Sequence, residues 1–188
     1  MGEVTLTPLV KVLLLVTGVV VSITDLRCRK IHNVVTFPMM LVGLALNAAP
    51  RDLRLAAGDW HVGAYGFAVG FGLMFVPFAL GMLKAGDVKY VAGVGALGGP
   101  WVALFTFLYG SLAHGVLCLG VLLRRGETRE AFRNIGYYFS RSVLVMKPVD
   151  FEARTQGHVP FAFSLALGLV ATLACVARIG NVFPLWVE

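Results

Sequence analysis

The sequence predicts an all-α membrane protein, a polytopic bundle of about six transmembrane helices with an amphipathic cytoplasmic segment. Of its 188 residues, 58% are hydrophobic and 14% are charged, whereas about a quarter of the residues in a soluble domain are charged. The apolar residues also fall in runs of a length that crosses a bilayer as a helix. These runs are continuously apolar rather than alternating, which disfavours a β-barrel.

The expected spans cover residues 8–24, 34–49, 62–83, 86–99, 100–123 and 159–177, and the whole chain, 1–188, is expected to form one integral membrane domain. A cleaved signal peptide is the alternative for the first run. The charged cluster follows that run rather than preceding it, and no small-residue cleavage site comes before Asp25, so we expect an uncleaved anchor. Residues 25–33 are expected to form a short basic turn, with Asn33 as the N-cap of the second helix.

Glycine and proline indicate how the middle of the chain is organised. Gly66 and Gly70 have the Gly-x-x-x-Gly spacing that lets helices approach closely. The apolar stretch 88–123 is too long for one span, and residues 98–100, Gly-Gly-Pro, are expected to form a turn between two. The first of these two spans is short, so it must begin at or before Asp87 or lie in a locally thin region of membrane.

Residues 124–158 form the one long polar segment of the chain. Apolar residues recur there at three- and four-residue steps with basic residues between them, which is typical of an amphipathic helix on the membrane surface. Contact with a substrate is the alternative to simple anchoring.

The basic residues predict the orientation in the membrane. With six spans, one side receives the loops around residues 25–33, 84–89 and 124–158, which hold 12 of the 16 Lys and Arg residues. The positive-inside rule makes that side cytoplasmic. Both termini are then expected outside, and the net charge of +6 reflects topology rather than nucleic-acid binding.

Two carboxylates at the ends of spans are the candidate chemical centre. Asp25 follows the first apolar run and Asp87 lies at the start of the fourth span. An ionisable group at membrane depth is costly and marks a functional site. Two carboxylates in contact cannot both ionise easily, so they share a proton. That state suits aspartyl proteolysis, in which one carboxylate takes a proton from water and the other polarises the scissile carbonyl. Interfacial ion pairs with neighbouring basic residues are the alternative from spacing alone.

Both acidic stretches resemble signatures of type IV prepilin peptidases. Residues 25–33, Asp-Leu-Arg-Cys-Arg-Lys-Ile-His-Asn, resemble the Asp-x-Arg…Ile-Pro-Asn signature of that family, and residues 85–89, Ala-Gly-Asp-Val-Lys, resemble its Gly-x-Gly-Asp-Val-Lys signature. Residues 95–100 and 159–168 are also similar to the family. The small size resembles the subgroup that serves tight-adherence (Flp-type) pili.

The resemblance implies that Asp25 and Asp87 are the catalytic pair. It further implies that the chain removes the basic leader of type IV prepilins or pseudopilins at the cytoplasmic face of a bacterial or archaeal inner membrane. The residues expected to shape the site or bind the substrate come from the same two signatures: Gly86, Lys89, Arg27, Asn33 and Lys84. No metal and no cofactor is implied, and the three scattered cysteines form neither a disulfide framework nor a zinc site.

Three departures from the family qualify this prediction. Lys84 stands where the family has the first glycine of its second signature, so a lysine ammonium could lie beside Asp87 or snorkel away. His32 replaces the usual proline. Larger relatives carry a cysteine-rich insert and N-methylate the cut pilin, whereas here a few residues with one cysteine, Cys28, join the first two spans. We therefore expect peptidase activity without N-methyltransferase activity.

Two other functions stay open from the sequence. A non-enzymatic membrane scaffold of a pilus or secretion assembly would need the helices but not the acid pair. A small transporter would favour acids at the middle of the membrane, whereas these lie at span ends. The remaining histidines show no metal-ligand spacing, and His114 is expected to pack inside a span.

Overall fold

The structure, a computed structural model, describes residues 6–28, 31–49, 60–126 and 160–179. These residues form the helices α1 (Pro8–Cys28), α2 (Asn33–Ala48), α3 (Trp60–Ala79), α4 (Ala85–Gly98), α5 (Pro100–Arg125) and α7 (Phe161–Ile179). The all-helical class is therefore confirmed for the described residues. The amphipathic helix expected over 124–158 lies outside them, apart from its first residues, which belong to the end of α5.

A helix lies at each of the six expected positions, but some ends differ from the prediction. The turn expected over residues 25–33 is wrong at both ends, because α1 continues to Cys28 and α2 begins at Asn33. His32 rather than Asn33 takes the N-cap position. α3 ends at Ala79, short of the expected 83, because Gly81 adopts a left-handed φ of 74° that breaks the helix.

Three of the helices, α1, α3 and α5, are long and apolar enough to cross a membrane. α2 and α7 are apolar but shorter. α4 has 14 residues, which corresponds to about 21 Å, against about 30 Å for the hydrocarbon core of a bilayer. The prediction of six spans is thus supported for three helices and stays a prediction for the other three.

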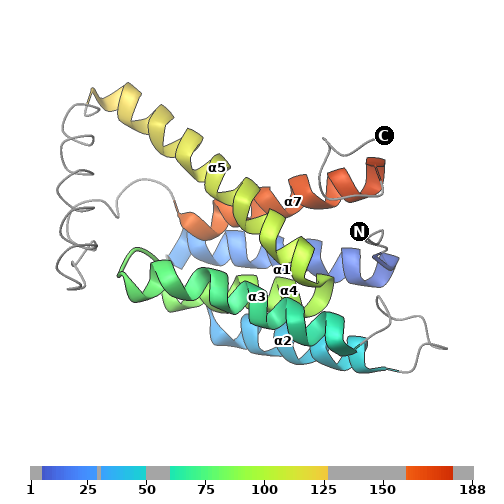
Figure 1. Cartoon of the computed structure of the whole chain (residues 1–188). Coiled ribbons are helices and arrows are strands. Elements are labelled where there is room, and N and C mark those ends of the chain that lie inside the picture. The colour runs from blue at the N-terminus through green and yellow to red at the C-terminus, as the bar shows by residue number, and fades with distance from the viewer. Residues whose placement is uncertain (1–5, 29–30, 50–59, 127–159, 180–188) are drawn as a thin grey trace.

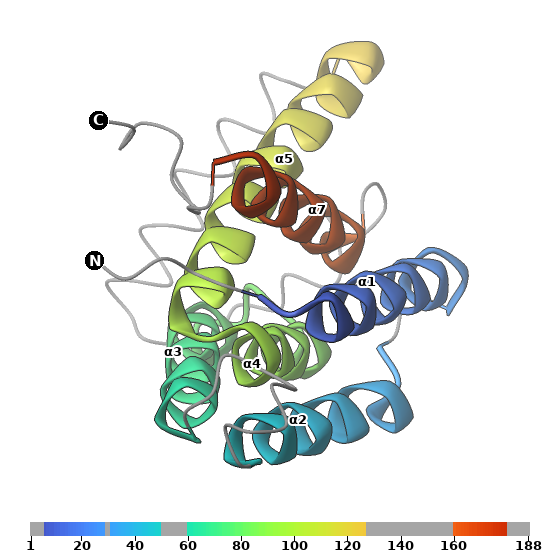
Figure 2. The ribbon, with the colours of Figure 1, turned by 90° about the vertical axis from the view of Figure 1, so that its right-hand side faces the viewer.

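α4 lies at the centre of the bundle and contacts α1, α2, α3 and α5 (Figures 1 and 2). Every residue from Tyr90 to Gly98 is buried, as expected for a helix that is apolar or small on all sides. α3 packs closely on it, since a Cβ on Gly66 would overlap the carbonyl of Gly95 and a Cβ on Gly70 would overlap that of Val91. The helix-packing role predicted for the Gly-x-x-x-Gly pair is therefore confirmed.

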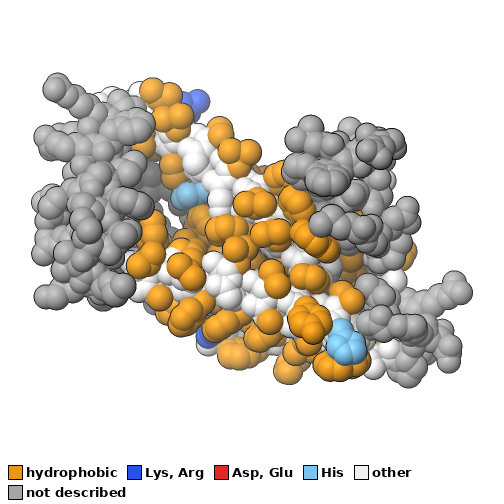
Figure 3. Space-filling view, viewed as in Figure 1, with side chains coloured by type: hydrophobic (Ala, Val, Ile, Leu, Met, Phe, Trp, Pro, Cys, Tyr) orange, Lys and Arg blue, Asp and Glu red, His pale blue; other side chains and the backbone are white. Residues whose placement is uncertain are grey.

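α5 follows the bundle only over its first half. Its buried residues, Val102, Ala103, Thr106 and Gly110, all lie in that half, and the C-terminal half of the helix extends away from α3 and α4 (Figure 1). Figure 3 shows hydrophobic side chains over the face formed by α3 and α5. Such an extended apolar surface is unusual for a soluble monomer and fits a surface in contact with lipid.

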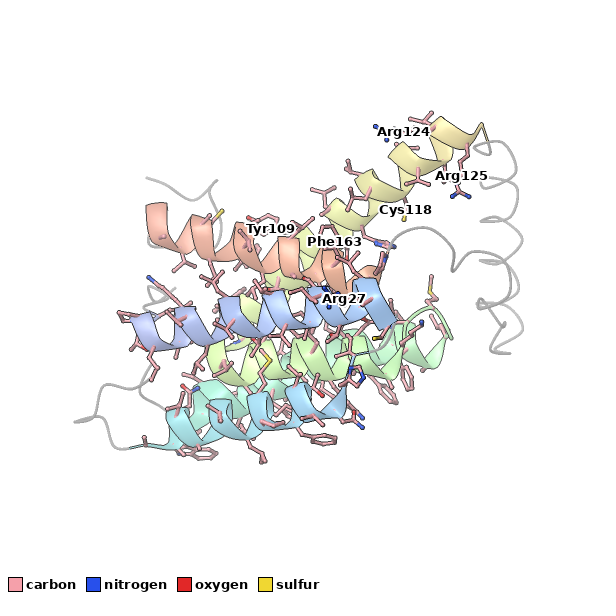
Figure 4. The ribbon with its side chains drawn as sticks, turned by 180° about the vertical axis from the view of Figure 1, so that it is seen from behind. Arg27, Tyr109, Cys118, Arg124, Arg125 and Phe163 are labelled. Atoms are coloured by element: carbon pink, nitrogen blue, oxygen red, sulfur yellow. The ribbon has the colours of Figure 1, made fainter. Side chains whose placement is uncertain are left out.

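Consecutive helices alternate in direction, so one end of the bundle collects the end of α1, the start of α2, the turn between α3 and α4, the end of α5 and the start of α7 (Figure 1). We call this the motif end, because both sequence signatures lie there. Basic residues gather at it as well, including Arg27, Arg124 and Arg125 (Figure 4).

Candidate active site

Asp25 faces the interior of the bundle. It ends a buried stripe on α1 that begins with Val10, Leu14, Gly18 and Val21, at the three- and four-residue steps of one helix face. Its side chain is only 7% exposed. Oδ2 of Asp25 accepts a hydrogen bond of 3.1 Å from the N–H of Ala162, in the first turn of α7. Amides in the first turn of a helix have no partner within the helix, and that end of the helix favours negative charge.

Asp87 lies in the first turn of α4 and is 5% exposed. Its Oδ2 accepts a hydrogen bond of 3.2 Å from the N–H of Lys84, and its own N–H donates to the carbonyl of Lys84 at 3.0 Å. A carboxylate at the third helical position that reaches back to the N-cap amide is one half of a capping box. The local sequence therefore fixes the orientation of Asp87.

The structure brings the two aspartates together. α1 contacts α4, and the carboxylates of Asp25 and Asp87 interact electrostatically. Each is buried and each accepts a hydrogen bond from an amide at the start of a helix. Two buried carboxylates within range of each other's charge do not both ionise easily.

The two signatures meet at two further points. Nζ of Lys89, on α4, donates a hydrogen bond of 3.0 Å to Oδ1 of Asn33, on α2. The same ammonium lies 5.0 Å from the centre of the Phe37 ring, within range of a cation–π interaction. Gly86 faces Ile31, and a Cβ added to Gly86 would lie 2.9 Å from the Cβ of Ile31. Glycine at 86 thus lets the start of α4 approach the segment before α2.

Lys84 and Arg27 expose their side chains at the motif end. Lys84 has φ −89° and ψ 150°, an extended conformation that any residue adopts. The backbone therefore does not require the glycine found at this position in the family signature. Lys84 reaches Asp87 through its backbone N–H and through the charge of its ammonium. Arg27 (Figure 4) lies two residues beyond Asp25 on α1, and because residues of a helix share a face only at three- and four-residue steps, the two side chains lie on different sides.

Sequence reasoning found residues 159–168 similar to the family but assigned neither the start of α7 nor His114 a role in the site. The N–H of Ala162 holds Asp25, yet a backbone amide leaves no trace in the sequence. His114 was expected simply to pack inside a span, but it hydrogen-bonds Ser164 of α7 and Cys118 of its own helix. The spacing of four between His114 and Cys118 is the one available signal. Among the described residues, no group of three His, Cys, Asp or Glu side chains is placed to hold a metal ion.

An apolar helical bundle with buried acids at one end belongs to the class of membrane-embedded helical proteins. The sequence pattern of the type IV leader peptidase family matches residues 12–119, and the chain belongs to that family. The matched segment contains Asp25 and Asp87, whereas Ala162 and the rest of α7 lie outside it. No significant match was found among curated proteins or among solved structures.

Proposed function

We propose that this leader peptidase is an aspartyl endopeptidase that removes the basic leader of type IV prepilins or pseudopilins at the cytoplasmic membrane face. Membership of the family supports leader cleavage in general. The observation that carries the aspartyl mechanism is the pairing of Asp25 with Asp87. Both are buried, they come from two different helices, and they interact electrostatically.

The chemistry requires one proton shared by the pair. The ionised carboxylate takes a proton from a water molecule while the water oxygen attacks the scissile carbonyl carbon. The protonated carboxyl donates its proton to the carbonyl oxygen. The tetrahedral intermediate then collapses as the leaving nitrogen takes a proton from the pair. Because coupled acids titrate as a unit, neither role is assigned to one residue.

We place the motif end at the cytoplasmic face, with six membrane-crossing helices and both termini outside. The described basic residues at that end, Arg27, Lys84, Lys89, Arg124 and Arg125, support this orientation through the positive-inside rule. α4 is shorter than the hydrocarbon core, so the protein and the bilayer around it would adapt in thickness. A prepilin with its basic leader on the cytoplasmic side would then reach Asp25 and Asp87 at the membrane surface.

We also infer that the chain does not methylate the pilin it cuts. The segment between the end of α1 and the start of α2, residues 29–32, leaves no room for an inserted domain. Purified protein, cut pilin and a labelled methyl donor should give no labelled pilin. Label that depends on the protein would contradict this inference.

The test of the proposed function is cleavage of a candidate prepilin co-expressed with wild type, Asp25→Ala or Asp87→Ala. Wild type should remove the leader, and both variants should leave the precursor uncut, because each lacks one half of the pair. Loss of the leader is read by mass spectrometry of the pilin, at matched amounts of membrane-inserted protein. Cleavage by either variant would remove that aspartate from the mechanism. A scaffold would support pilus assembly with both variants.

A further inference from the structure

A polar cluster on α5 and α7 lies outside the two signatures. Nδ1 of His114 is 3.0 Å from Oγ of Ser164, and Nε2 of His114 is 3.3 Å from Sγ of Cys118. The ring also meets the Phe161 ring edge-on, with the ring centres 4.9 Å apart and an interplanar angle of 79°. His114 thus has a partner at each ring nitrogen and a third at its ring edge.

Two of these partners belong to the turn that holds Asp25. α7 begins at Phe161, and Phe161, Ala162 and Ser164 all lie in its first turn. The N–H of Ala162 donates to Asp25 at 3.1 Å. The side chain of His114 therefore contacts the residue before Ala162 and the residue two positions after it.

We propose that His114 is a positioning residue, which fixes the first turn of α7 so that its amide holds Asp25 in place for catalysis. This inference rests on the proposed function. His114 acts through Ser164 and the α7 backbone rather than on the substrate. The hydrogen bond between His114 and Ser164 joins α5 to α7 two residues from Ala162, whose N–H orients Asp25.

The packing of α5 on α7 places His114 at the first turn of α7. Around Gly110 the two helices touch closely, because a Cβ on Gly168 would overlap the backbone of Gly110. His114 lies one turn further along α5. A Cβ on Gly110 would lie 3.3 Å from the carbonyl oxygen of Ser164, so the first turn of α7 is contacted by the backbone of α5 at Gly110 and by the side chain of His114.

The burial of Ser164 argues in the same direction. Its side chain is fully buried, and a buried hydroxyl needs a hydrogen-bond partner. His114 supplies that partner from a different helix. Cys118 bonds the other nitrogen of the ring from one turn along α5 (Figure 4), and it thereby fixes the ring orientation. Loss of the His114–Ser164 bond would leave a buried polar group unpaired, a cost that favours movement of the turn.

The test uses two variants that separate the ring nitrogens. In His114→Asn the amide group takes the place of Nδ1, next to Ser164. In His114→Gln it takes the place of Nε2, next to Cys118. Both variants lose the ring contact with Phe161 equally, so each is the control for the other. A net hydrogen bond of this kind changes a rate by roughly 3- to 10-fold.

In prepilin cleavage we expect His114→Gln to lower kcat by about 3- to 10-fold with little change in KM, and His114→Asn to stay within about twofold of wild type. A fall in kcat without a rise in KM separates positioning of Asp25 from a loss of substrate binding. Equal losses in both variants, or no loss in either, would overturn the inference.

A second measurement does not depend on activity. In a protein with Cys28 and Cys175 replaced by serine, Asp25→Cys and Ala162→Cys are introduced together and oxidised in membranes. The disulfide should form readily with His114 or His114→Asn and less with His114→Gln. Equal disulfide formation in all three would overturn the inference. If wild type fails to cut any prepilin, or Asp25→Ala still cuts, the proposed function fails, and disulfide formation alone decides whether His114 positions the turn.

Discussion

Asp25 and Asp87 are held in different ways, although both are buried at the same end of the bundle. Asp87 is held by a residue three positions earlier in the sequence, through the amide of Lys84. Asp25 is held by the amide of Ala162, which lies 137 residues further along the chain. Asp25 also lies near the C-terminal end of its own helix, where the helix dipole disfavours negative charge. The start of α7 is the N-terminal end of a helix, whose dipole favours the negative charge of Asp25.

This difference shows which parts of the chain form the candidate site. Residues 84–87 can orient Asp87 as soon as the first turn of α4 forms. Asp25 takes its place only when α7 packs against α1, so the last helix belongs to the site even though the match to the family ends at residue 119. Changes in α7 should therefore act on Asp25 more strongly than local changes act on Asp87.

The largest effect short of removing an aspartate is expected from Ala162→Pro. Proline removes the N–H that holds Asp25 and is tolerated in the first turn of a helix. A hydrogen bond to a charged group contributes about 1.5–3 kcal/mol, so the initial rate of leader removal should fall roughly 10- to 100-fold. The control is Ala162→Gly, which keeps the N–H. A proline variant as active as the glycine variant would show that this amide does not hold Asp25.

A smaller effect is expected from Lys84→Pro, which removes the corresponding amide from Asp87. The φ of −89° at Lys84 is close to the range of proline, and the N–H of Asp87 still donates to the carbonyl of residue 84. We expect a fall of about 3- to 10-fold in the initial rate of prepilin cleavage.

The control for this change is Lys84→Gly, which keeps the amide and removes the ammonium. Because the side chain is exposed and the backbone is extended, Lys84→Gly should change the rate by less than about threefold. If the two variants lost activity equally, the ammonium rather than the amide would matter. If Lys84→Gly raised the rate of cleavage about tenfold, the lysine side chain would be shown to lower the activity of the natural sequence.

The smallest effect is expected from Asn33→Ala, which removes the hydrogen bond from Lys89 and leaves the cation–π contact with Phe37 in place. The bond is exposed, so the rate of cleavage should fall only about 2- to 5-fold. Val34→Ala is the matched control, since Val34 is the next residue and is 82% exposed. Equal rates in the two variants would show that the Asn33–Lys89 hydrogen bond does not contribute to cleavage.

The helices were predictable because their apolar runs exclude most alternatives. The end of α1 was not, since its basic residues suggest a turn. In the structure the buried stripe of Val10, Leu14, Gly18 and Val21 continues through Asp25 and keeps the chain helical. The stripe was visible in the sequence, but it becomes informative only when the buried face is known.

The candidate site was predictable where side chains form it and not where the backbone does. Asp25, Asp87, Asn33 and Lys89 came from their signatures, and the structure places Asn33 beside Lys89. The amide of Ala162 is common to almost every residue type, so the family resemblance of residues 159–168 does not indicate that this amide contacts Asp25. The sequence could not show whether lysine is tolerated at position 84, where the family has glycine. The backbone angles of Lys84 show that glycine is not required there.

The most direct test of the acid pair compares Asp25→Asn, Asp87→Asn and the double variant in prepilin cleavage. Asparagine keeps an oxygen that can accept the helix amide, so the site retains its shape while one charge is lost. Groups that act as a unit are not additive. We predict that each single variant is as inactive as the double variant at equal amounts of protein in the membrane. Leader removal by either single variant at a rate close to wild type would contradict the claim that Asp25 and Asp87 form one catalytic pair.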